Sequence, residues 1–556
     1  MAIASDVNAV PPEAEGGNRD LPSDLSPAPV RSYASYIGDR DVPGAGWVYT
    51  VSSRSLLEDV FTSISVKRAL EQNPDSPTAL HPYVVGRVAV AEVADIDAAV
   101  DAAVSASEEW AAVPLNDRMR LGELFLAQLR ENRETLLELL MAEAHPRKLA
   151  EWELSCLEQV YSEESCSWYR QQMQADFNHG PRRLIVRRSP DGVVCINPPQ
   201  NAPAPSAALA VLVLMAGNAV VVRAPRSIAL STMYVVRELI APLLRKVGAP
   251  PGTLNAVCGR PQQTIDRWLA HPGVNDVIYF GGSEEGLRFE RECVTRGKKP
   301  VLELAGNDGL VVWRDADLPM AAEAVTECFY GSGQICMVPN YVLAHPAIAD
   351  DLLAEVIRQV ADLRPGYPED PGVLLSPVRR SERFFRLLRQ ALDTGAELVC
   401  GGRRIELDGT PSDTGVFLEP TVVRVDGLAG ARRFDVVTHE TFFPLIPVVV
   451  PEAADDEALL DGLVDFVNTN RYGLRNSLWA RDQRVVDTFV NRTRNGGLLK
   501  VNDSHIGFLP YLPSHGGTGL TGGAFGEANY PILKTSHLQG VSLADGIRPR
   551  TAVFGE

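Results

Sequence analysis

The sequence predicts an α/β protein with two lobes, each built on a parallel β-sheet. Short apolar segments alternate with amphipathic helical segments over residues 190–305, and a second alternating set covers about residues 308–480. This alternation is typical of parallel strands joined by crossover helices. The chain has 556 residues, of which 45% are hydrophobic, so it can form several buried cores.

The N-terminal third is expected to be mainly helical. Residues 1–45 are rich in Pro, Ser, Gly and acidic residues, so we expect a disordered or extended segment without a core there. A strand-like segment starts at Val85. Amphipathic helices are expected over residues 116–132, 133–144 and 148–172. The apolar run 202–217 contains two prolines and is too short to span a membrane, so we expect a buried helix.

Each lobe has its own set of expected elements. The second lobe starts with the strand-like segment Gly309–Trp313, followed by a helix over residues 321–330. The first lobe has five apolar strand candidates, which are Gly192–Asn197, Ala219–Arg223, Thr253–Val257, Asp276–Phe280 and Val301–Leu304.

Charge and cysteine content narrow the class of protein. The formal net charge of -18 disfavours binding to nucleic acid or to an anionic membrane. The eight cysteines show neither metal-ligand spacing nor the density of a disulfide framework, so we expect reduced thiols, no metal site and a cytoplasmic protein. We also expect no secretory signal, because no positively charged segment precedes an apolar core at the N-terminus.

Two residues are candidates for covalent chemistry. Cys336 lies in the glycine-rich stretch G-S-G-Q-I-C-M, where substrate can reach a thiolate, although most buried cysteines are only small apolar residues. Upstream, Glu303 is flanked by Val301, Leu302 and Leu304, and desolvation of such a carboxyl favours a general base. Alone, Glu303 fits a solvent-facing strand end better. Together, the two residues predict a nucleophile and its base.

Several motifs occur in a fixed order along the chain. Glu303 starts E-L-A-G-N and Cys336 ends F-Y-G-S-G-Q-I-C. The others are P-P-Q-N-A-P (198–203), A-G-N-A-V-V-V-R (216–223), H-E-T-F-F-P (439–444), N-R-Y-G-L-R-N-S-L-W-A-R-D (470–482) and G-G-T-G-L-T-G-G (516–523). In these motifs the sequence resembles the NAD(P)-dependent aldehyde dehydrogenase superfamily, from about residue 85 to 540.

The resemblance implies a domain organisation. A Rossmann-like cofactor-binding domain is expected over residues 46–305, an α/β catalytic domain over 306–500, and a C-terminal return and oligomerisation segment over 501–556. By the same analogy, a strand at 181–188 and the stretch around 525–545 form a small oligomerisation element in a homodimer or homotetramer.

The resemblance also implies a reaction. Cys336 attacks a small-molecule aldehyde to give a thiohemiacetal, which is oxidised with NAD(P)+ to an acyl-enzyme. The side-chain amide of Asn201 and the backbone N–H of Cys336 stabilise the oxyanion. Asn201 can also act as a helix cap. Glu303 activates the water that releases a carboxylic acid. The alternatives are an enzyme that forms or reduces a thioester on the same fold and a non-catalytic cofactor-binding protein.

The expected cofactor site draws on several segments. Gly281, Gly282 and Gly286 follow an apolar strand and precede a helix, a context in which glycine lets the backbone approach a pyrophosphate, although such glycines are often only conformational. By resemblance, Pro199 and Phe442 contribute to cofactor binding, as does Glu440, which resembles the residue that binds the nicotinamide ribose. The alternative for Glu440 is an exposed loop residue.

Two arginines favour NADP over NAD. Arg223 stands where the family usually has Lys, and Arg226 where NAD-preferring members commonly have Glu. Two guanidinium groups can bind a 2′-phosphate, although both can also be solvated or paired with surface carboxylates. The substrate pocket is expected to include Ile335, Met337, Trp168, Tyr169 and the loop 505–511, and the identity of the aldehyde stays open.

Overall fold

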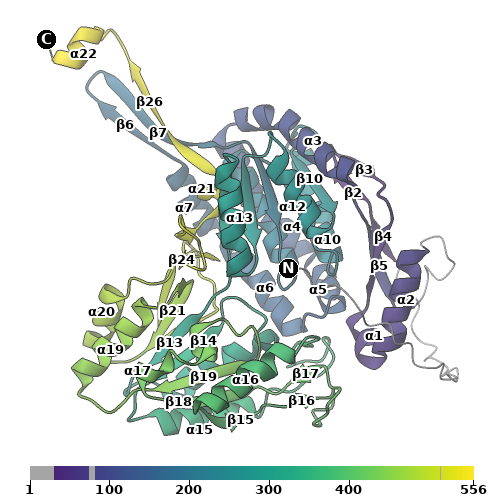
Figure 1. Ribbon diagram of the computed structural model, residues 1–556. Helices are drawn as coiled ribbons and strands as arrows, with labels where there is room; N and C mark the ends of the chain where they lie inside the picture. The colour runs from purple at the N-terminus through teal and green to yellow at the C-terminus, as the bar shows by residue number, and fades with distance from the viewer. Residues whose placement is uncertain (1–29, 74–81, 514, 556) are drawn as a thin grey trace.

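Two sheets of mainly parallel strands form the centres of the two lobes in the computed structural model, which describes residues 30–73, 82–513 and 515–555 (Figure 1). Among these residues, the first sheet has the strand order β12-β11-β8-β9-β10-β2-β3. Its strands are β2 (Ser35–Ile37), β3 (Arg40–Val42), β8 (Val193–Asn197), β9 (Ala219–Ala224), β10 (Leu254–Cys258), β11 (Asp276–Phe280) and β12 (Lys299–Glu303). The predicted α/β fold class is confirmed.

The second sheet has the order β15-β18-β19-β14-β13-β21-β22. All neighbouring pairs are parallel except β15 with β18. Its strands are β13 (Asp308–Val312), β14 (Pro339–Ala344), β15 (Glu397–Cys400), β18 (Thr421–Asp426), β19 (Leu445–Val450), β21 (Arg475–Trp479) and β22 (Leu498–Val501). We keep the predicted domain boundaries near residues 305 and 500 as a proposal.

The strand order of the first sheet determines where a ligand can bind. β8 pairs with β9 on one side and with β11 on the other. The strands that follow β8 are therefore added first toward one edge of the sheet, as β9 and β10, and then toward the other edge, as β11 and β12. Open α/β sheets bind ligands at the carboxyl ends of their strands beside such a reversal. Asn197 and Phe280 end β8 and β11, so the segments that follow them border the expected crevice.

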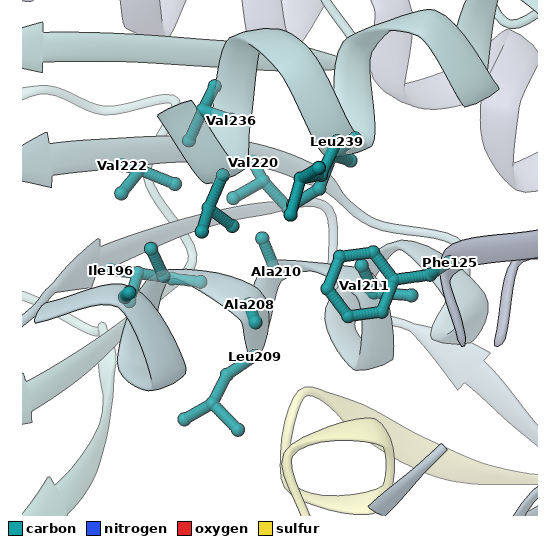
Figure 2. Close-up of a cluster of buried hydrophobic side chains, with 14 of the residues drawn as sticks. Phe125, Ile196, Ala208, Leu209, Ala210, Val211, Val220, Val222, Val236 and Leu239 are labelled. Carbon is teal, nitrogen blue, oxygen red and sulfur yellow. The ribbon is translucent and has the colours of Figure 1, made fainter. Parts of the chain in front are cut away.

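The core of the first lobe lies between this sheet and the helices that cover it (Figure 2). Side chains of β8 and β9 pack against α4 (Leu115–Glu131), α9 (Ala210–Ala216) and the π-helical turn η2 (Val235–Ile240). Full burial of each large aliphatic side chain contributes roughly 1.5–3 kcal/mol. The buried residues shown include Phe125, Ile196, Val211, Val220, Val222 and Leu239.

The remaining helices of the first lobe are α3 (Val93–Ala112), α5 (Arg133–Ala142), α6 (Arg147–Val160), α7 (Glu163–Met173), α8 (Pro203–Ala208), α10 (Leu230–Tyr234), α11 (Ala241–Lys246), α12 (Pro261–Ala270) and α13 (Ser283–Thr295). The single helix predicted over residues 148–172 is wrong, because α6 and α7 are separate helices. The side chain of Ser162 accepts a hydrogen bond from Ser165 N and starts α7. The apolar run 202–217 likewise forms two helices, α8 and α9, rather than one.

The second lobe contains α14 (Leu318–Thr326), the 3₁₀ turn η3 (Glu327–Gly333), α15 (Ala349–Val360), α16 (Glu382–Thr394), α19 (Asp456–Asn468) and α20 (Gln483–Arg492). The helix predicted over 321–330 therefore ends at Thr326, and the turn η3 takes over before the nucleophile candidate. No helix of the described residues is long and apolar enough to cross a membrane.

The N-terminal segment is more ordered than its composition suggests. Residues 31–42 form β1 (Arg31–Tyr33), β2 and β3, and β2 extends the first sheet by pairing with β10. The expectation of a disordered or coreless segment over residues 1–45 is wrong for this part, because the aromatic side chains of Tyr33 and Tyr36 are buried in the core. Residues 1–29 lie outside the described residues. The next elements are β4 (Trp47–Val51), α1 (Ser53–Glu58), α2 (Val60–Gln72) and β5 (Val84–Ala89).

A three-stranded sheet projects from the body of the molecule (Figure 1). It consists of β6 (Gln174–His179), β7 (Arg182–Pro190) and β26 (Ser536–Ala544), and β26 pairs with β7 from Ser536 opposite Pro190 to Ala544 opposite Arg182. The stretch 181–188, predicted as a strand, lies almost entirely in β7. The exposed apolar side chains of this three-stranded sheet include Phe177, Val186, Leu538 and Leu543.

Candidate active site

Cys336 follows a turn of unusual backbone conformation. Gly331, Ser332 and Gly333 have φ values of 61°, 55° and 72°, a left-handed region that favours glycine. Ser332 is held there by its hydroxyl, which donates to Ser376 O at 2.7 Å. A Cβ at Gly333 would lie 2.2 Å from Phe443 O, so this position requires glycine. The turn leaves Cys336 partly exposed just before β14.

Glu303 ends β12 and is only 7% exposed. Gly516 N donates to its Oε2 at 2.9 Å, and the Asn529 side-chain amide donates to its Oε1. Burial raises the pKa of this carboxyl to about 8, although both hydrogen bonds favour the charged form. Glu303 is therefore mostly protonated at neutral pH and becomes a base near pH 8. No motif predicted Gly516 or Asn529 as its partners.

The structure brings Cys336 and Glu303 together. Burial raises the pKa of the Cys336 thiol to about 12, and the nearby carboxyls of Glu440 and Glu303 raise it further, whereas Arg475 lowers it. The segment after Glu303 also touches the nucleophile, since a Cβ at Gly306 would lie 2.2 Å from Cys336 O. The thiol is thus surrounded by acidic groups and one buried guanidinium.

Asn201 reaches the same segment from the other lobe. Its side-chain nitrogen donates to Gln334 O at 3.0 Å, two residues before Cys336. An amide nitrogen carries two N–H groups, so a second donor is left for an oxyanion. The alternative helix-cap role is wrong, because Ala202 occupies the N-cap of α8 and that cap makes no side-chain hydrogen bond.

Glu440 and Phe442 border the site from the loop before β19. Glu440 Oε1 accepts a hydrogen bond from Gly306 N at 3.0 Å, so its carboxyl lies beside the segment that follows Glu303. Burial raises the pKa of Glu440 to about 7, while the Gly306 N–H and Arg383 favour its charged form. Phe442 has a left-handed φ of 58°. Glu440 is therefore not the exposed loop residue of the alternative interpretation.

An apolar cluster surrounds Cys336. Of the predicted pocket residues, Ile335, Met337 and Phe508 belong to it, but Trp168 and Tyr169 pack against Tyr530 in the core of the first lobe. Neither side chain belongs to the cluster around Cys336, and their pocket role stays a prediction. Ile506 of the predicted loop 505–511 also belongs to the cluster, and residues that were not predicted for the pocket complete it, namely Trp152, Tyr330, Val338 and Leu474.

The glycine-rich turn after β11 combines two roles. Gly281 N donates to Glu303 O at 3.2 Å, and a Cβ at Gly282 would meet no atom within 4 Å, so the backbone before α13 is open to a ligand. A Cβ at Gly286 would instead lie 2.1 Å from the Leu304 side chain. Gly282 therefore leaves room for a phosphate. Gly281, where a Cβ would lie 2.8 Å from the Tyr279 ring, and Gly286 instead allow close packing of the turn and of α13.

A groove of about 310 Å³ lies between α12 and α13, next to this turn. The ring of Tyr279 stacks on Phe289 at its base, with centroids 4.5 Å apart and an interplanar angle of 18°. A flat nucleobase fits such a groove. The groove is lined by polar and apolar residues of both helices, including Gln262, Ile265, Leu269, Glu285, Arg288 and Glu292.

The two arginines contain buried atoms that lack partners. Arg223 is 4% exposed and donates from Nε to Asn197 Oδ1 at 2.5 Å and from Nη2 to Pro198 O at 3.3 Å, which fixes the segment before Pro199. Burial lowers the pKa of Arg223 to about 10. Arg223 Nη1 and Arg226 Nε are buried without a hydrogen-bond partner among the described residues. With the open turn and the groove, these residues fit an anionic dinucleotide.

Comparison with known proteins agrees with this architecture. The aldehyde dehydrogenase family matches residues 72–535, so the chain belongs to this family. The resemblance inferred from the motifs is thereby confirmed, and β1 to β4, α1 and nearly all of α2 precede the matched region. A 3,6-anhydro-alpha-L-galactose dehydrogenase of a Vibrio species is 28% identical over 461 residues, covering 80% of this chain and 91% of the relative.

Further relatives and solved structures resemble the chain. The benzaldehyde dehydrogenase of Bacillus subtilis is 28% identical and is matched over 89% of its length, by 80% of this chain. An NAD-dependent aldehyde dehydrogenase from Sinorhizobium meliloti has the same fold, with a TM-score of 0.77, 22% identity and coverage of 93% of this chain and 96% of that one. A Mycobacterium tuberculosis aldehyde dehydrogenase complexed with NAD+ gives a TM-score of 0.74 at 22% identity, covering 93% and 100% of the two chains.

Proposed function

We propose that this protein oxidises an aldehyde to a carboxylic acid with NAD(P)+, with Cys336 as nucleophile and Glu303 as general base. The observation that carries the proposal is the buried carboxyl of Glu303, held by Gly516 and Asn529 in electrostatic contact with the Cys336 thiol. Membership of the family and relatives named for the oxidation of sugar-derived and aromatic aldehydes support the reaction class.

The first step is addition to the carbonyl. Ionised Glu303 accepts the proton of Cys336, and the thiolate forms a C–S bond with the aldehyde carbon. Negative charge develops on the carbonyl oxygen. The free amide N–H of Asn201 and the backbone N–H of Cys336 are its donors, and such a preorganised donor contributes roughly 3 kcal/mol to the transition state.

The nicotinamide ring, when bound, accepts the two electrons and the hydrogen that leave the aldehyde carbon. Cys336 then carries the acyl group as a thioester. After Glu303 has released its proton to solvent, it accepts a proton from water as the water oxygen attacks the acyl carbon. Collapse of this intermediate breaks the C–S bond, releases the acid and restores Cys336.

The cofactor preference is proposed to be NADP. Arg226 and Arg223 present buried cationic atoms without partners beside the crevice of the first sheet. A phosphate on the adenosine ribose supplies the oxygen acceptors that these atoms need. Glu440, Phe442 and Pro199 are proposed to border the nicotinamide end. The turn Gly281–Gly282 is proposed to border the pyrophosphate end, and Gly286 lets α13 pack close to this turn.

The test is the near-ultraviolet absorbance of reduced nicotinamide when purified protein meets aliphatic and aromatic aldehydes with NADP or NAD. Growth of the signal, with free acid as product, is the expected result. Formation of an acyl thioester when coenzyme A is added would indicate thioester chemistry instead. Absence of turnover with every aldehyde and both cofactors would contradict the proposed function.

We also propose that the sheet β6-β7-β26 joins copies of the chain in a homodimer or homotetramer. Its exposed apolar side chains, such as Leu538 and Leu543, support this role. Light scattering of a chain that ends at residue 535 is expected to show a smaller assembly than the full chain. An unchanged mass would remove β26 from the interface.

A further inference from the structure

The short segment Ser504–Phe508 is bound by buried charged side chains. Glu327 in η3 is 7% exposed, and its carboxylate accepts from Ser504 Oγ at 2.5 Å and from Ile506 N at 3.1 Å. Glu327 and Cys336 belong to the same stretch of chain. The segment is therefore joined directly to the part of the second lobe that presents the nucleophile.

Two buried cations bind the carbonyl groups of the same segment. Lys500 is 4% exposed and donates from Nζ to Ser504 O at 2.7 Å and to Gly507 O at 2.6 Å. Arg475 is 2% exposed and donates from Nη1 to His505 O at 2.7 Å. One anion and two cations thus bind the backbone of four consecutive residues. Buried charges are costly unless bonded, which makes this a strongly defined position for a loop.

The ring of His505 adds a further anchor. It is fully buried, with Nδ1 2.6 Å from Ser477 Oγ and Nε2 3.6 Å from Asp308 Oδ2. Burial lowers the pKa of His505, and the cations Arg475 and Lys500 lower it further, so the ring is neutral. The anchoring does not depend on a charged histidine.

The anchored segment forms one wall of the pocket at Cys336. Ile506 and Phe508 belong to the apolar cluster around the thiol. The ring of Phe508 meets Trp152 edge to face at 6.1 Å and 76°, and His515 at 6.2 Å and 70°. Aromatic side chains in this arrangement favour a flat ring over a short flexible chain.

We propose that Glu327, Arg475 and Lys500 are positioning residues that fix Ser504–Phe508 against Cys336 and thereby select aldehydes with an aromatic ring. The inference rests on the proposed function, because it assigns the cluster around Cys336 as the substrate pocket. None of the three residues is required to touch the reacting atoms. They act through the backbone that carries Ile506 and Phe508.

The experiment compares the full-length protein with Glu327→Gln, Lys500→Met and Ser504→Ala. Ser504 Oγ and Ile506 N donate to different oxygens of Glu327, and glutamine replaces one of these oxygens by an NH2 group, which cannot accept. The ratio of kcat/KM for benzaldehyde to that for acetaldehyde is expected to fall about tenfold, mainly through KM for benzaldehyde, since loss of positioning acts on the bound pose. Lys500→Arg, which keeps the charge and donors, is expected to restore most of the ratio.

A second readout does not depend on turnover. The rate of alkylation of Cys336 by N-benzylmaleimide, relative to iodoacetamide, is measured by mass spectrometry of the peptide that contains Cys336. This ratio is expected to fall in Glu327→Gln and in the milder Ser504→Ala, with unchanged circular dichroism. If the wild type oxidises no aldehyde, the proposed function fails, while the alkylation ratio still tests the position of the segment.

The matched control is Asp315→Asn. Asp315 also holds a loop of the second lobe, because its carboxylate accepts hydrogen bonds from the backbone N–H groups of Arg481 and Asp482. This contact lies beyond the carboxyl ends of β13 and β21. Both ratios are expected to stay at the wild-type value in this variant. Unchanged ratios in the folded Ser504→Ala and Lys500→Met proteins, or an equal fall in Asp315→Asn, would overturn the inference.

Discussion

On the substrate side of the candidate site, buried charged groups are bonded to the protein itself, whereas on the cofactor side buried cationic atoms lack a partner. Glu327 and Lys500 bind the backbone of the segment Ser504–Phe508. Arg226 Nε and Arg223 Nη1 have no hydrogen-bond partner among the described residues. The protein itself supplies the partners of the Glu327 and Lys500 charges, whereas Arg223 Nη1 and Arg226 Nε gain a partner only when an anion binds.

This difference separates what each side contributes. A completed network holds the pocket wall and the nucleophile in place before substrate arrives, which lowers the cost of positioning. Cationic atoms without a partner do not hold a segment in place, but they form charge-assisted hydrogen bonds when an anion binds. Substitutions on the two sides are therefore expected to affect different measurements.

The largest effect is expected from Cys336→Ala, which removes the nucleophile alone. Turnover should fall at least roughly 10⁴-fold, while cofactor affinity, measured by quenching of protein fluorescence, stays the same. Cys400→Ala is the control, because Cys400 is the other cysteine that is not fully buried. Full turnover by Cys336→Ala would exclude the covalent mechanism.

Glu303→Gln is expected to stop both proton transfers that are assigned to Glu303. Gln cannot accept a proton from water, so steady-state turnover should fall about 10³-fold. If another base takes the thiol proton, the acyl-enzyme still forms. Stopped-flow absorbance then shows one equivalent of reduced cofactor before hydrolysis of the acyl-enzyme limits turnover. Glu290→Gln is the matched control, because Glu290 is also 7% exposed and binds a backbone N–H, that of Ala524. Equal losses in both variants would point to a structural rather than a chemical role for Glu303.

The pH profile tests the same carboxyl without a substitution. Burial raises the pKa of Glu303 to about 8, so its basic form is a minor species at pH 6 and the main species at pH 9. A single ionisation with this pKa predicts that the acyl-enzyme hydrolysis rate rises roughly a hundredfold between pH 6 and pH 9 and then levels off. A profile that is flat above pH 6 would show that Glu303 is already ionised there.

The same raised pKa has a consequence for stability. The folded protein keeps the Glu303 proton up to about pH 8, while the unfolded carboxyl releases it near its ordinary pKa of 4.5. The folded state therefore binds more protons between these values. The contribution of Glu303 to the free energy of unfolding falls as pH rises through this window. Denaturant unfolding of Glu303→Gln against wild type at pH 5 and pH 8 measures it.

The smallest effect is expected on the cofactor side. Arg226→Gln removes one cationic partner, so the Kd for NADP should rise roughly tenfold, while the Kd for NAD changes less than twofold. Isothermal titration calorimetry measures both constants. Arg403→Gln is the control, because Arg403 is exposed and paired with Glu419 at 2.7 Å. Equal changes for NADP and NAD would contradict the assignment of Arg226 to the 2′-phosphate.

Much of the fold could be predicted from local patterns. Four of the five strand candidates in residues 190–305 lie within one residue of β8 to β11, because parallel strands buried on both faces are continuous apolar runs. The fifth, Val301–Leu304, overlaps β12, which starts two residues earlier. The composition of residues 1–45 did not indicate the strands at residues 31–42, where Tyr33, Tyr36 and Ile37 are buried in the core. Helix ends at Thr326 and Val160 depend on tertiary packing and capping, which periodicity does not report.

By itself, the sequence determined the family and the α/β class, and it predicted Cys336, Glu303, Asn201 and Glu440 as site residues, because their motifs are local and ordered. Only the tertiary structure decided which residues contact these side chains. Asn529 meets Glu303, and Glu327 meets Ser504, across more than a hundred intervening residues. Contacts at such separation leave no pattern within a motif, since they depend on how two separate sheets and their loops pack.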